Sequence, residues 1–268
     1  MRPISQLTMP ETITSLQNER VKLAHALQNQ SKARRKEGKM ALEGVRLVQD
    51  ALSRGLQPDF ILYDPNAIAE EALIKTGHIS SSLFPVSAEI IRYLSDTETP
   101  QGIIGVFPLQ PPALPETPSR ILILDAIGDP GNMGTILRSA AAAGVQAVFN
   151  APGSVDAYNP KVLRAGMGAH FRMPVLEASW TRIALYCQSL RVYLADMTGD
   201  VSYDQADWRA PHALIIGSEA HGESEQAAQL ATQRVYIPMA AETESLNAAV
   251  AASIMLFEAA RQKNAGAL

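Results

Sequence analysis

The sequence predicts two α/β domains, the second built on a parallel sheet that helices cover on both faces. Three observations predict this class: the length of 268 residues, a proline-rich segment near residue 110, and short strands after it that are apolar throughout and alternate with helical segments. At roughly 100–200 residues per domain, this length fits two domains that each bury a core.

The domain boundary is predicted at residues 108–119, which read PLQPPALPETPS. Five prolines in twelve residues exclude a helix or a central strand, because each proline removes a backbone donor and fixes φ. We therefore expect a small domain over residues 1–107, a semi-rigid linker over 108–119 and a second domain over 120–268.

Each expected element follows from its apolar pattern. The small domain should contain a helix through Val21, Leu23, Ala24 and Leu27, a second helix over residues 44–52, and strands at 60–63 and 103–107. In the second domain, strands are expected at 121–126, 147–150, 173–176, 192–195, 213–216 and 235–237, with helices at 133–143, 160–166, 180–190 and 224–231.

The last helix is expected to begin at Ser245, a favourable N-cap. Leu246, Val250, Ile254 and Phe257 recur on it at spacings of four, four and three. A helix this apolar belongs in a core or an interface.

Composition excludes several classes of protein. A charged fraction of 19% with 47% apolar residues excludes a disordered chain, and the single cysteine, Cys187, excludes a disulfide framework and a cysteine-based zinc site. No apolar run approaches the ~20 residues that cross a bilayer, and the first eleven residues carry no signal-peptide pattern. We therefore expect a cytoplasmic protein with no metal and no membrane partner.

The net charge of −4 conceals an uneven distribution. Residues 1–60 hold ten Lys or Arg against six Asp or Glu, and the remainder holds thirteen against twenty-one. The basic excess favours a surface for a polyanion, since Lys and Arg supply most sequence-independent affinity for nucleic acid. A solvated, salt-bridged helix face is the alternative. The candidate RNA-binding residues here are Arg34, Arg35, Lys36 and Arg46.

Three loops follow expected strands, where ligands bind in open parallel sheets. In the first, residues 127–134, Gly128, Gly131 and Gly134 are expected to let the backbone turn sharply near a ligand, ahead of a helix that carries Arg138. Their spacing is not that of the dinucleotide fingerprint, which disfavours a nicotinamide enzyme. Arg138 is either a structural arginine that caps a neighbouring element or a contact to phosphate or ribose.

The second and third loops cover residues 216–223 and 237–247. Gly217 and Gly222 bracket Glu219, which is either a functional carboxylate at a strand end or a cap for the helix that starts at Ser224. In the third loop, apolar side chains around Pro238 have the character of walls for a flat heterocycle.

In combination, these loops resemble the three motifs of the SpoU (TrmH) family of SPOUT-class RNA 2'-O-ribose methyltransferases. The motif residues are Asn132, Gly134 and Arg138; Gly217, Ser218, Glu219 and Gly222; and Ile237, Pro238, Met239, Ser245, Leu246, Asn247 and Ala251. Ala41 to Gly44, Leu47, Val48 and Gln101 to Ile103 are similar to the family's ribosomal-protein-like substrate-binding domain.

The resemblance implies a C-terminal trefoil knot, a rare exception to unknotted chain connections. It also implies S-adenosyl-L-methionine as methyl donor, an RNA substrate and a homodimer formed through the last helix. The cofactor-binding residues it implies are Gly217, Ile237, Leu246, Thr198, Met239, Ser245 and Asn247, in loops that start near residues 195, 216 and 237.

The resemblance also assigns roles at the reacting end of the site. It places Arg138 at the 2'-hydroxyl, where a guanidinium that stays protonated orients phosphate and stabilises a developing alkoxide more readily than it acts as a base. Asn132 would position the nucleotide or Arg138, Glu219 would orient Arg138 or its loop, and Arg164 would contact RNA. Gly166 stands where a serine is common in the family.

Two other functions stay open at this point: a non-catalytic RNA-binding or ribosome-assembly factor, and a nucleotide-dependent enzyme of the doubly wound type. The separate first domain favours rRNA over tRNA as the substrate, because folded RNA is recognised mainly by shape.

Overall fold

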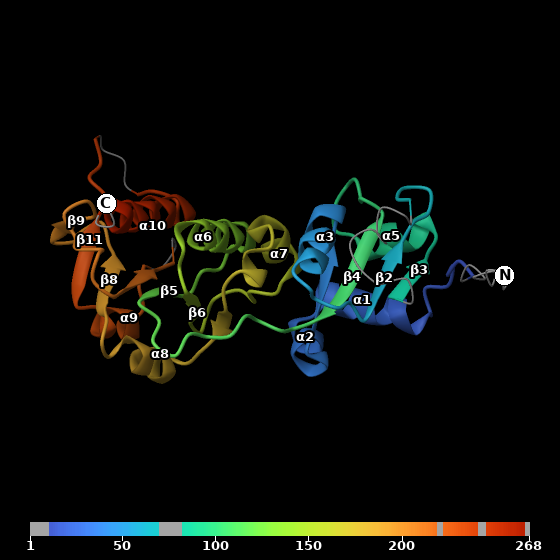
Figure 1. Ribbon diagram of the computed structural model, residues 1–268, viewed down its shortest axis with the longest axis horizontal. Helices are drawn as coiled ribbons and strands as arrows, with labels where there is room; N and C mark the ends of the chain where they lie inside the picture. Colours follow the sequence, from blue (N-terminus) through green and yellow to red (C-terminus); the bar gives the residue numbers. More distant parts are fainter. Residues whose placement is uncertain (1–10, 70–81, 219–221, 241–244, 266–268) are drawn as a thin grey trace, which may run out of the picture. The chain divides into compact units, whose positions relative to one another are not determined.

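The computed structural model describes residues 11–69, 82–218, 222–240 and 245–265 (Figure 1). The chain forms two compact units, Met1–Leu109 and Gln110–Leu268. Each unit has its own sheet and its own buried core.

The first unit is a four-stranded mixed sheet with helices against it. β4 pairs antiparallel with β1 and β2, whereas β2 and β3 are parallel, in the order β1-β4-β2-β3. The strands are β1 (Lys39–Glu43), β2 (Phe60–Tyr63), β3 (Leu83–Pro85) and β4 (Ile103–Pro108), and the helices are α1 (Glu19–Asn29), α2 (Ser31–Glu37), α3 (Val45–Ser53) and α5 (Ala88–Leu94).

The apolar pattern of the first unit explains its core. Val21, Ala24 and Leu27 share one face of α1, as predicted, and pack with Ile90 and Leu94 of α5 over the sheet. Because Gln30 is extended, the basic stretch that follows α1 turns into the separate short helix α2.

The second unit is a seven-stranded parallel sheet in the order β7-β6-β5-β10-β8-β11-β9. Its strands are β5 (Arg120–Leu124), β6 (Ala147–Asn150), β7 (Val175–Glu177), β8 (Arg191–Ala195), β9 (Val201–Ser202), β10 (His212–Ile216) and β11 (Gln233–Tyr236). Its helices are α6 (Pro130–Ala143), α7 (Pro160–Gly166), the 3₁₀ turn η2 (Ala169–Phe171), α8 (Trp180–Cys187), α9 (Glu225–Leu230) and α10 (Ala248–Ala265).

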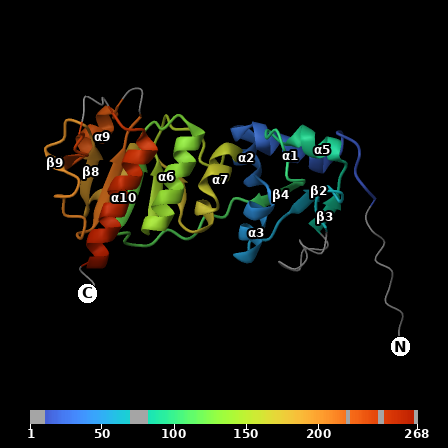
Figure 2. The same ribbon diagram turned by 90° about the horizontal axis from the view of Figure 1, so that it is seen from above.

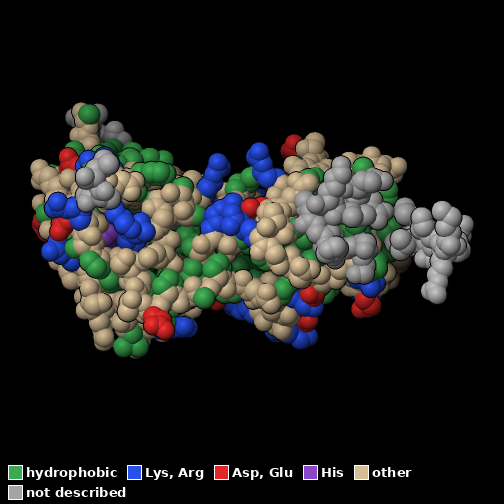
Figure 3. Space-filling view, in the orientation of Figure 1, with side chains coloured by type: hydrophobic (Ala, Val, Ile, Leu, Met, Phe, Trp, Pro, Cys, Tyr) green, Lys and Arg blue, Asp and Glu red, His purple; other side chains and the backbone are tan. Residues whose placement is uncertain are grey.

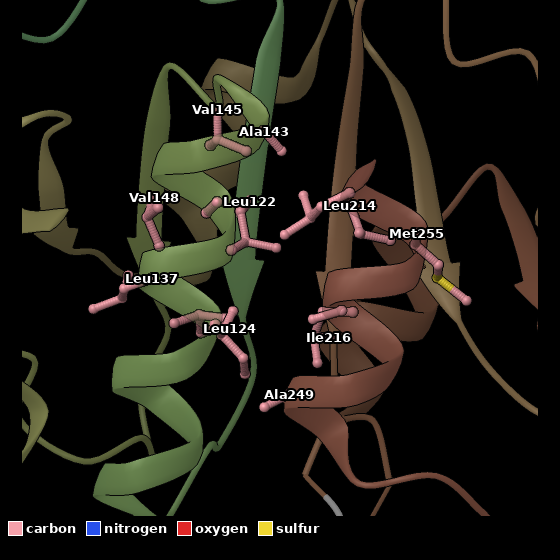
Figure 4. Close-up of a cluster of buried hydrophobic side chains, with 14 of the residues drawn as sticks. Leu122, Leu124, Leu137, Ala143, Val145, Val148, Leu214, Ile216, Ala249 and Met255 are labelled. Atoms are coloured by element: carbon pink, nitrogen blue, oxygen red, sulfur yellow. The ribbon is translucent and has the colours of Figure 1, made fainter. Parts of the chain in front are cut away.

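Helices cover both faces of this sheet, as the apolar strands predict. Leu122 and Leu124 of β5 point toward α6, and α10 lies beside α6 on the same face (Figures 2 and 4). The alternate residues Ile121 and Ile123 pack with α8 and α9 on the other face. A strand buried on both sides needs apolar residues at every position, and β5 has them at all but its first. The predicted α/β class is confirmed, and the trefoil knot stays a prediction.

Two predicted helix starts are wrong, each because another side chain caps the helix. α6 begins at Pro130, since Asp129 Oδ1 accepts from the Asn132 N–H at 2.7 Å. α10 begins at Ala248, since Asn247 Oδ1 accepts from the N–H groups of Ala249 at 3.0 Å and Val250 at 3.3 Å. Ser245 is therefore not the cap of the last helix.

The early start of α6 changes the role of its glycines. Gly131 and Gly134 are helical, and none of Gly128, Gly131 and Gly134 has a positive φ. A Cβ on Gly134 would lie 2.4 Å from Ala165 Cβ and 2.8 Å from the Val162 carbonyl oxygen of α7. The expected sharp turn is therefore wrong, and Gly134 serves the close approach of two helices.

Candidate active site

A cavity of about 330 Å³ lies beyond the carboxyl ends of β8, β10 and β11, formed by the loops that follow them. Five of the predicted cofactor-binding residues line it, namely Gly217, Ile237, Met239, Ser245 and Leu246. Its other described lining residues are Ala195, Asp196, Met197, Ile216, Ser218, Gly222, Glu223, Val235, Tyr236, Ala248, Ala251 and Met255.

Two predicted cofactor residues lie elsewhere. Thr198 is not part of the described lining, and both its N–H and its hydroxyl donate to Asp196 Oδ1, at 2.9 and 3.0 Å. Asn247 caps α10 just beyond Leu246. Both residues shape loops that reach the cavity without lining it.

The loop after β10 forms a tight turn. Ser218 and Gly222 exchange backbone hydrogen bonds of 3.0 and 2.9 Å, and Gly222 has φ +68°. A Cβ on Gly217 would lie 3.0 Å from the Gly222 carbonyl oxygen, so only glycine fits there without a shift. Glu219, the third predicted catalytic residue, lies outside the described residues.

Asp125 ties this loop to the centre of the sheet. Its buried Oδ2 accepts from the Ser224 N–H at 2.6 Å, and its backbone N–H donates to the Ile216 carbonyl at 2.9 Å. Ser224 itself caps α9 through its hydroxyl. The second motif is therefore anchored at its base to β5, and the helix cap once considered for Glu219 is supplied by Ser224.

Three charged residues that the motifs do not include form a network at the cavity. Arg234 Nη1 donates to Asp196 Oδ2 and, at 2.7 Å, to Glu223 Oε1. These hydrogen bonds, to Glu223 first and then to Asp196, raise the pKa of Arg234. Burial acts to raise the pKa of Asp196, but hydrogen bonds from Thr198 and Arg234 outweigh it, and the pKa lies below its ordinary value. The only sequence signal for this network is the position of Asp196 directly after β8.

The first and third motifs meet through one hydrogen bond. Asn247 Nδ2 donates to Asn132 Oδ1 at 3.0 Å, which joins the N-terminal ends of α10 and α6. Further along, the hydroxyls of Ser253 and Ser139 lie 2.7 Å apart. The chain thereby brings together two motifs separated by more than a hundred residues.

Arg138 lies on α6 with an exposed side chain. Among the described residues it has no hydrogen-bond or ion-pair partner, so its suggested role as a structural cap finds no support there. An exposed cation on a helix joined to the cofactor side of the site is placed to meet a large, charged substrate.

Comparison with known proteins agrees with this geometry. Residues 119–257 match the model of the SpoU rRNA Methylase family, and residues 18–105 match the MRM3-like substrate binding domain. The chain belongs to the SpoU rRNA methylase family. The resemblance inferred from the three motifs is thus confirmed.

Individual relatives extend over both units. The chain is 39% identical to the mouse (Mus musculus) rRNA methyltransferase 3, mitochondrial, over 85% of this chain and 69% of the relative. It is 32% identical to the 23S rRNA (guanosine(2553)-2'-O)-methyltransferase RlmP of Bacillus subtilis, over 91% and 97%. The AdoMet-bound rRNA methyltransferase from Sinorhizobium meliloti superposes with a TM-score of 0.81 at 31% identity, covering 94% of this chain and 97% of that one.

The predicted RNA-binding arginines of this SpoU protein are not equivalent. Arg34 is 3% exposed and donates to the Leu27 carbonyl at 2.5 Å, which corrects its assignment to a polyanion-facing surface. Arg35, Lys36 and Arg46 are exposed, and Arg164 on α7 is half-buried. On the second unit, Lys and Arg side chains gather over α6 and α7 (Figure 3).

Gly166, where the SpoU family often has serine, packs against a buried histidine. A Cβ at this position would lie 3.3 Å from His170 Cε1 and 3.5 Å from its Nδ1. His170 Nε2 bonds with the Ala157 carbonyl at 2.8 Å, while the buried Nδ1 has no hydrogen-bond partner in the described chain. Burial lowers the pKa of His170 to about 4.

Within the described ranges, no group of three His, Cys, Asp or Glu residues is arranged to hold a metal ion. In the same ranges, no helix is both long and apolar enough to span a bilayer.

Proposed function

We propose that this chain transfers a methyl group from S-adenosyl-L-methionine to a ribose 2'-hydroxyl of rRNA. Membership in the SpoU rRNA methylase family and the AdoMet-bound relative support the activity and the cofactor. The observation that carries the proposal is the cavity itself, which the second and third motifs line and which the Asn247–Asn132 hydrogen bond joins to the helix of Arg138.

The cavity suits an adenosyl group. Ile216, Ile237 and Leu246 offer apolar walls to a flat heterocycle, and loop backbone at Gly217 and Ser218 supplies hydrogen-bonding groups. S-Adenosyl-L-methionine supplies an activated methyl group on sulfur, so that the protein needs to bind, align and exclude water.

At the reacting end, we assign Arg138 to the RNA backbone. Its guanidinium stays protonated, so it orients a phosphate and stabilises negative charge that develops on the ribose oxygen. Asn132, held by Asn247, fixes the start of α6 and positions the nucleotide. Glu219 keeps its proposed role of orienting Arg138 or its loop.

We assign the first unit to RNA binding, in line with its match to a substrate binding domain. Arg35, Lys36 and Arg46 are exposed and supply phosphate contacts, together with Arg164 of the second unit. Arg34 is excluded from this set because its guanidinium is buried against backbone carbonyls.

We further propose a homodimer formed through α10. Val250 and Phe257 are 46% and 51% exposed, and Ile254 between them is half-buried, although the opposite side of the helix is already packed on the core. Water-exposed apolar residues at spacings of four and three favour a helix-mediated interface. The trefoil knot and a cytoplasmic location complete the proposal.

The interface is tested by measuring molar mass in solution by light scattering. Val250→Ser with Phe257→Ser should shift a dimer toward monomer, whereas Leu185→Ser on α8, at an equally exposed apolar residue, should not. A monomeric unmodified chain would contradict the dimer.

The activity is tested by incubating the protein with labelled S-adenosyl-L-methionine and rRNA and digesting the product to nucleosides. We expect label in a 2'-O-methylnucleoside, with a phosphodiester that resists alkali. Label in a methylated base contradicts the proposal. RNA binding without any transfer favours the assembly-factor alternative, and transfer to tRNA alone contradicts the assignment to rRNA.

A further inference from the structure

The cofactor cavity carries excess negative charge. Among its described lining residues, the charged side chains are Asp196 and Glu223, and both are acids. The cation in contact with them is Arg234, which donates to both carboxylates through the same nitrogen. One guanidinium against two carboxylates leaves a formal charge of −1 at the cavity wall.

This charge is fixed in a partly dehydrated place. The side chains of Asp196 and Glu223 are 13% and 29% exposed, and that of Arg234 is 34% exposed. Asp125, buried at the end of β5 and bonded to the N–H of Ser224 beside Glu223, adds charge of the same sign. Charges held away from bulk water are screened less by salt and act more strongly on a bound ion.

The proposed reaction changes the charge of the bound molecule. Sulfur keeps the electron pair of the broken carbon–sulfur bond, the methyl group moves to the ribose oxygen, and the hydroxyl proton passes to solvent. The cofactor therefore enters with a net charge of about +1 and leaves as the neutral S-adenosylhomocysteine. A cavity of net negative charge distinguishes these two states even though their shapes are nearly identical.

We propose that Glu223 makes the cavity selective for the cationic cofactor over its neutral product. Without Glu223, the remaining Asp196–Arg234 pair is formally neutral, so the excess charge depends on this second carboxylate. Arg234 holds both acids in place and bridges the loops after β8 and β10. Weaker binding of the product assists its release after each turnover. The inference rests on the proposed function of the cavity.

The test compares Kd values from calorimetry for three ligands: S-adenosyl-L-methionine, S-adenosylhomocysteine, and sinefungin, which has an ammonium group in place of the sulfonium. Glu223→Gln keeps an oxygen for the Arg234 hydrogen bond and removes one negative charge. Glu225→Gln is the matched control, since Glu225 is exposed two residues away and lies outside the described lining.

We expect Glu223→Gln to weaken both cationic ligands roughly threefold to thirtyfold, the range for one charge several ångströms away at partial exposure. The Kd of S-adenosylhomocysteine should change less than twofold, and Glu225→Gln should change none of the three. Equal weakening of all three ligands by Glu223→Gln, or weakening of the sulfonium ligand alone, overturns the inference. Failure of the unmodified protein to bind S-adenosyl-L-methionine instead contradicts the proposed function.

Discussion

Two glycine-containing segments at the same end of the large sheet do different work. In α6, Gly131 and Gly134 are helical, and Gly134 allows contact with α7. In the loop after β10, Gly217 and Gly222 close a turn against the cavity. The difference follows from the cap: Asp129 starts a helix and occupies a first-turn N–H, whereas Gly222, at φ +68°, keeps its segment outside a helix.

The same comparison separates two sides of the site. The cofactor side is a cavity whose loops are tied down by Asp125 and Arg234. The reacting side presents Arg138 on an exposed helix surface. A small cofactor needs an enclosed site, whereas a folded RNA needs an accessible one, so changes on one side should leave the other intact.

Arg138→Ala should have the largest effect. We expect loss of methyl transfer by about 10²- to 10³-fold, the usual effect of removing one group that stabilises developing charge. The Kd for S-adenosyl-L-methionine should stay within twofold, because Arg138 is not among the described lining residues of the cavity.

Arg182→Ala provides the control, since Arg182 is an exposed arginine on α8, against the opposite face of the sheet. Transfer that survives Arg138→Ala within a fewfold would remove Arg138 from the catalytic assignment.

Gly134→Ala should rank second. The new Cβ would meet Ala165 Cβ at 2.4 Å and backbone of α7 at 2.8 Å, which forces the two helices apart. We expect the free energy of unfolding to fall by about 3 kcal/mol, measured by urea denaturation. Gly131→Ala, whose Cβ meets only the Asp129 carboxylate at 3.1 Å, should change it by less than about 1 kcal/mol. Equal effects at the two glycines would contradict the packing role.

Buried His170 should make stability depend on pH. Its pKa is lowered to about 4 by burial, and the unfolded chain has the ordinary value of 6.5. Between these values the unfolded state binds the proton and the folded state does not, so stability falls as pH falls. From pH 7 to pH 5 the expected contribution is about 2 kcal/mol.

The check is the difference between the unmodified protein and His170→Leu, which should show a shallower loss of stability over this range. His212, whose pKa burial also lowers, stays in both proteins and cancels in the comparison. Parallel profiles for the two proteins would assign the pH dependence elsewhere.

Asn247 should show the smallest effect and join the two sides. Asn247→Ala removes the cap of α10 and the bond to Asn132, so we expect a loss of about 1 kcal/mol in unfolding free energy. Asn247→Ser keeps a capping oxygen but is too short to reach Asn132. If Asn132 positions the nucleotide, the serine variant restores stability but not the rate of transfer; full recovery of both would sink the positioning role.

Much of this architecture was readable from the sequence because it depends on local pattern. The apolar strands around residues 121–124, 147–150 and 213–216 are found where predicted, and five predicted cofactor-binding residues line one cavity. The family follows from three short motifs in order, and that prediction is confirmed.

The failures have tertiary causes. Arg34 reads as one more surface cation, but the bend at Gln30 turns its guanidinium onto the carbonyl of Leu27. The Arg234 network joins residues 38 and 11 positions apart, so no local pattern announces it. Ser245 and Asn247 are both good caps, and the choice between them rests on the bond from Asn247 to Asn132.

The most direct test of the central claim is to map 2'-O-methylated riboses in the RNA of cells with and without this gene. The account predicts loss of methylation at a defined rRNA ribose, restored by the unmodified gene and not by Arg138→Ala. An unchanged rRNA map, or a loss confined to tRNA, would contradict it.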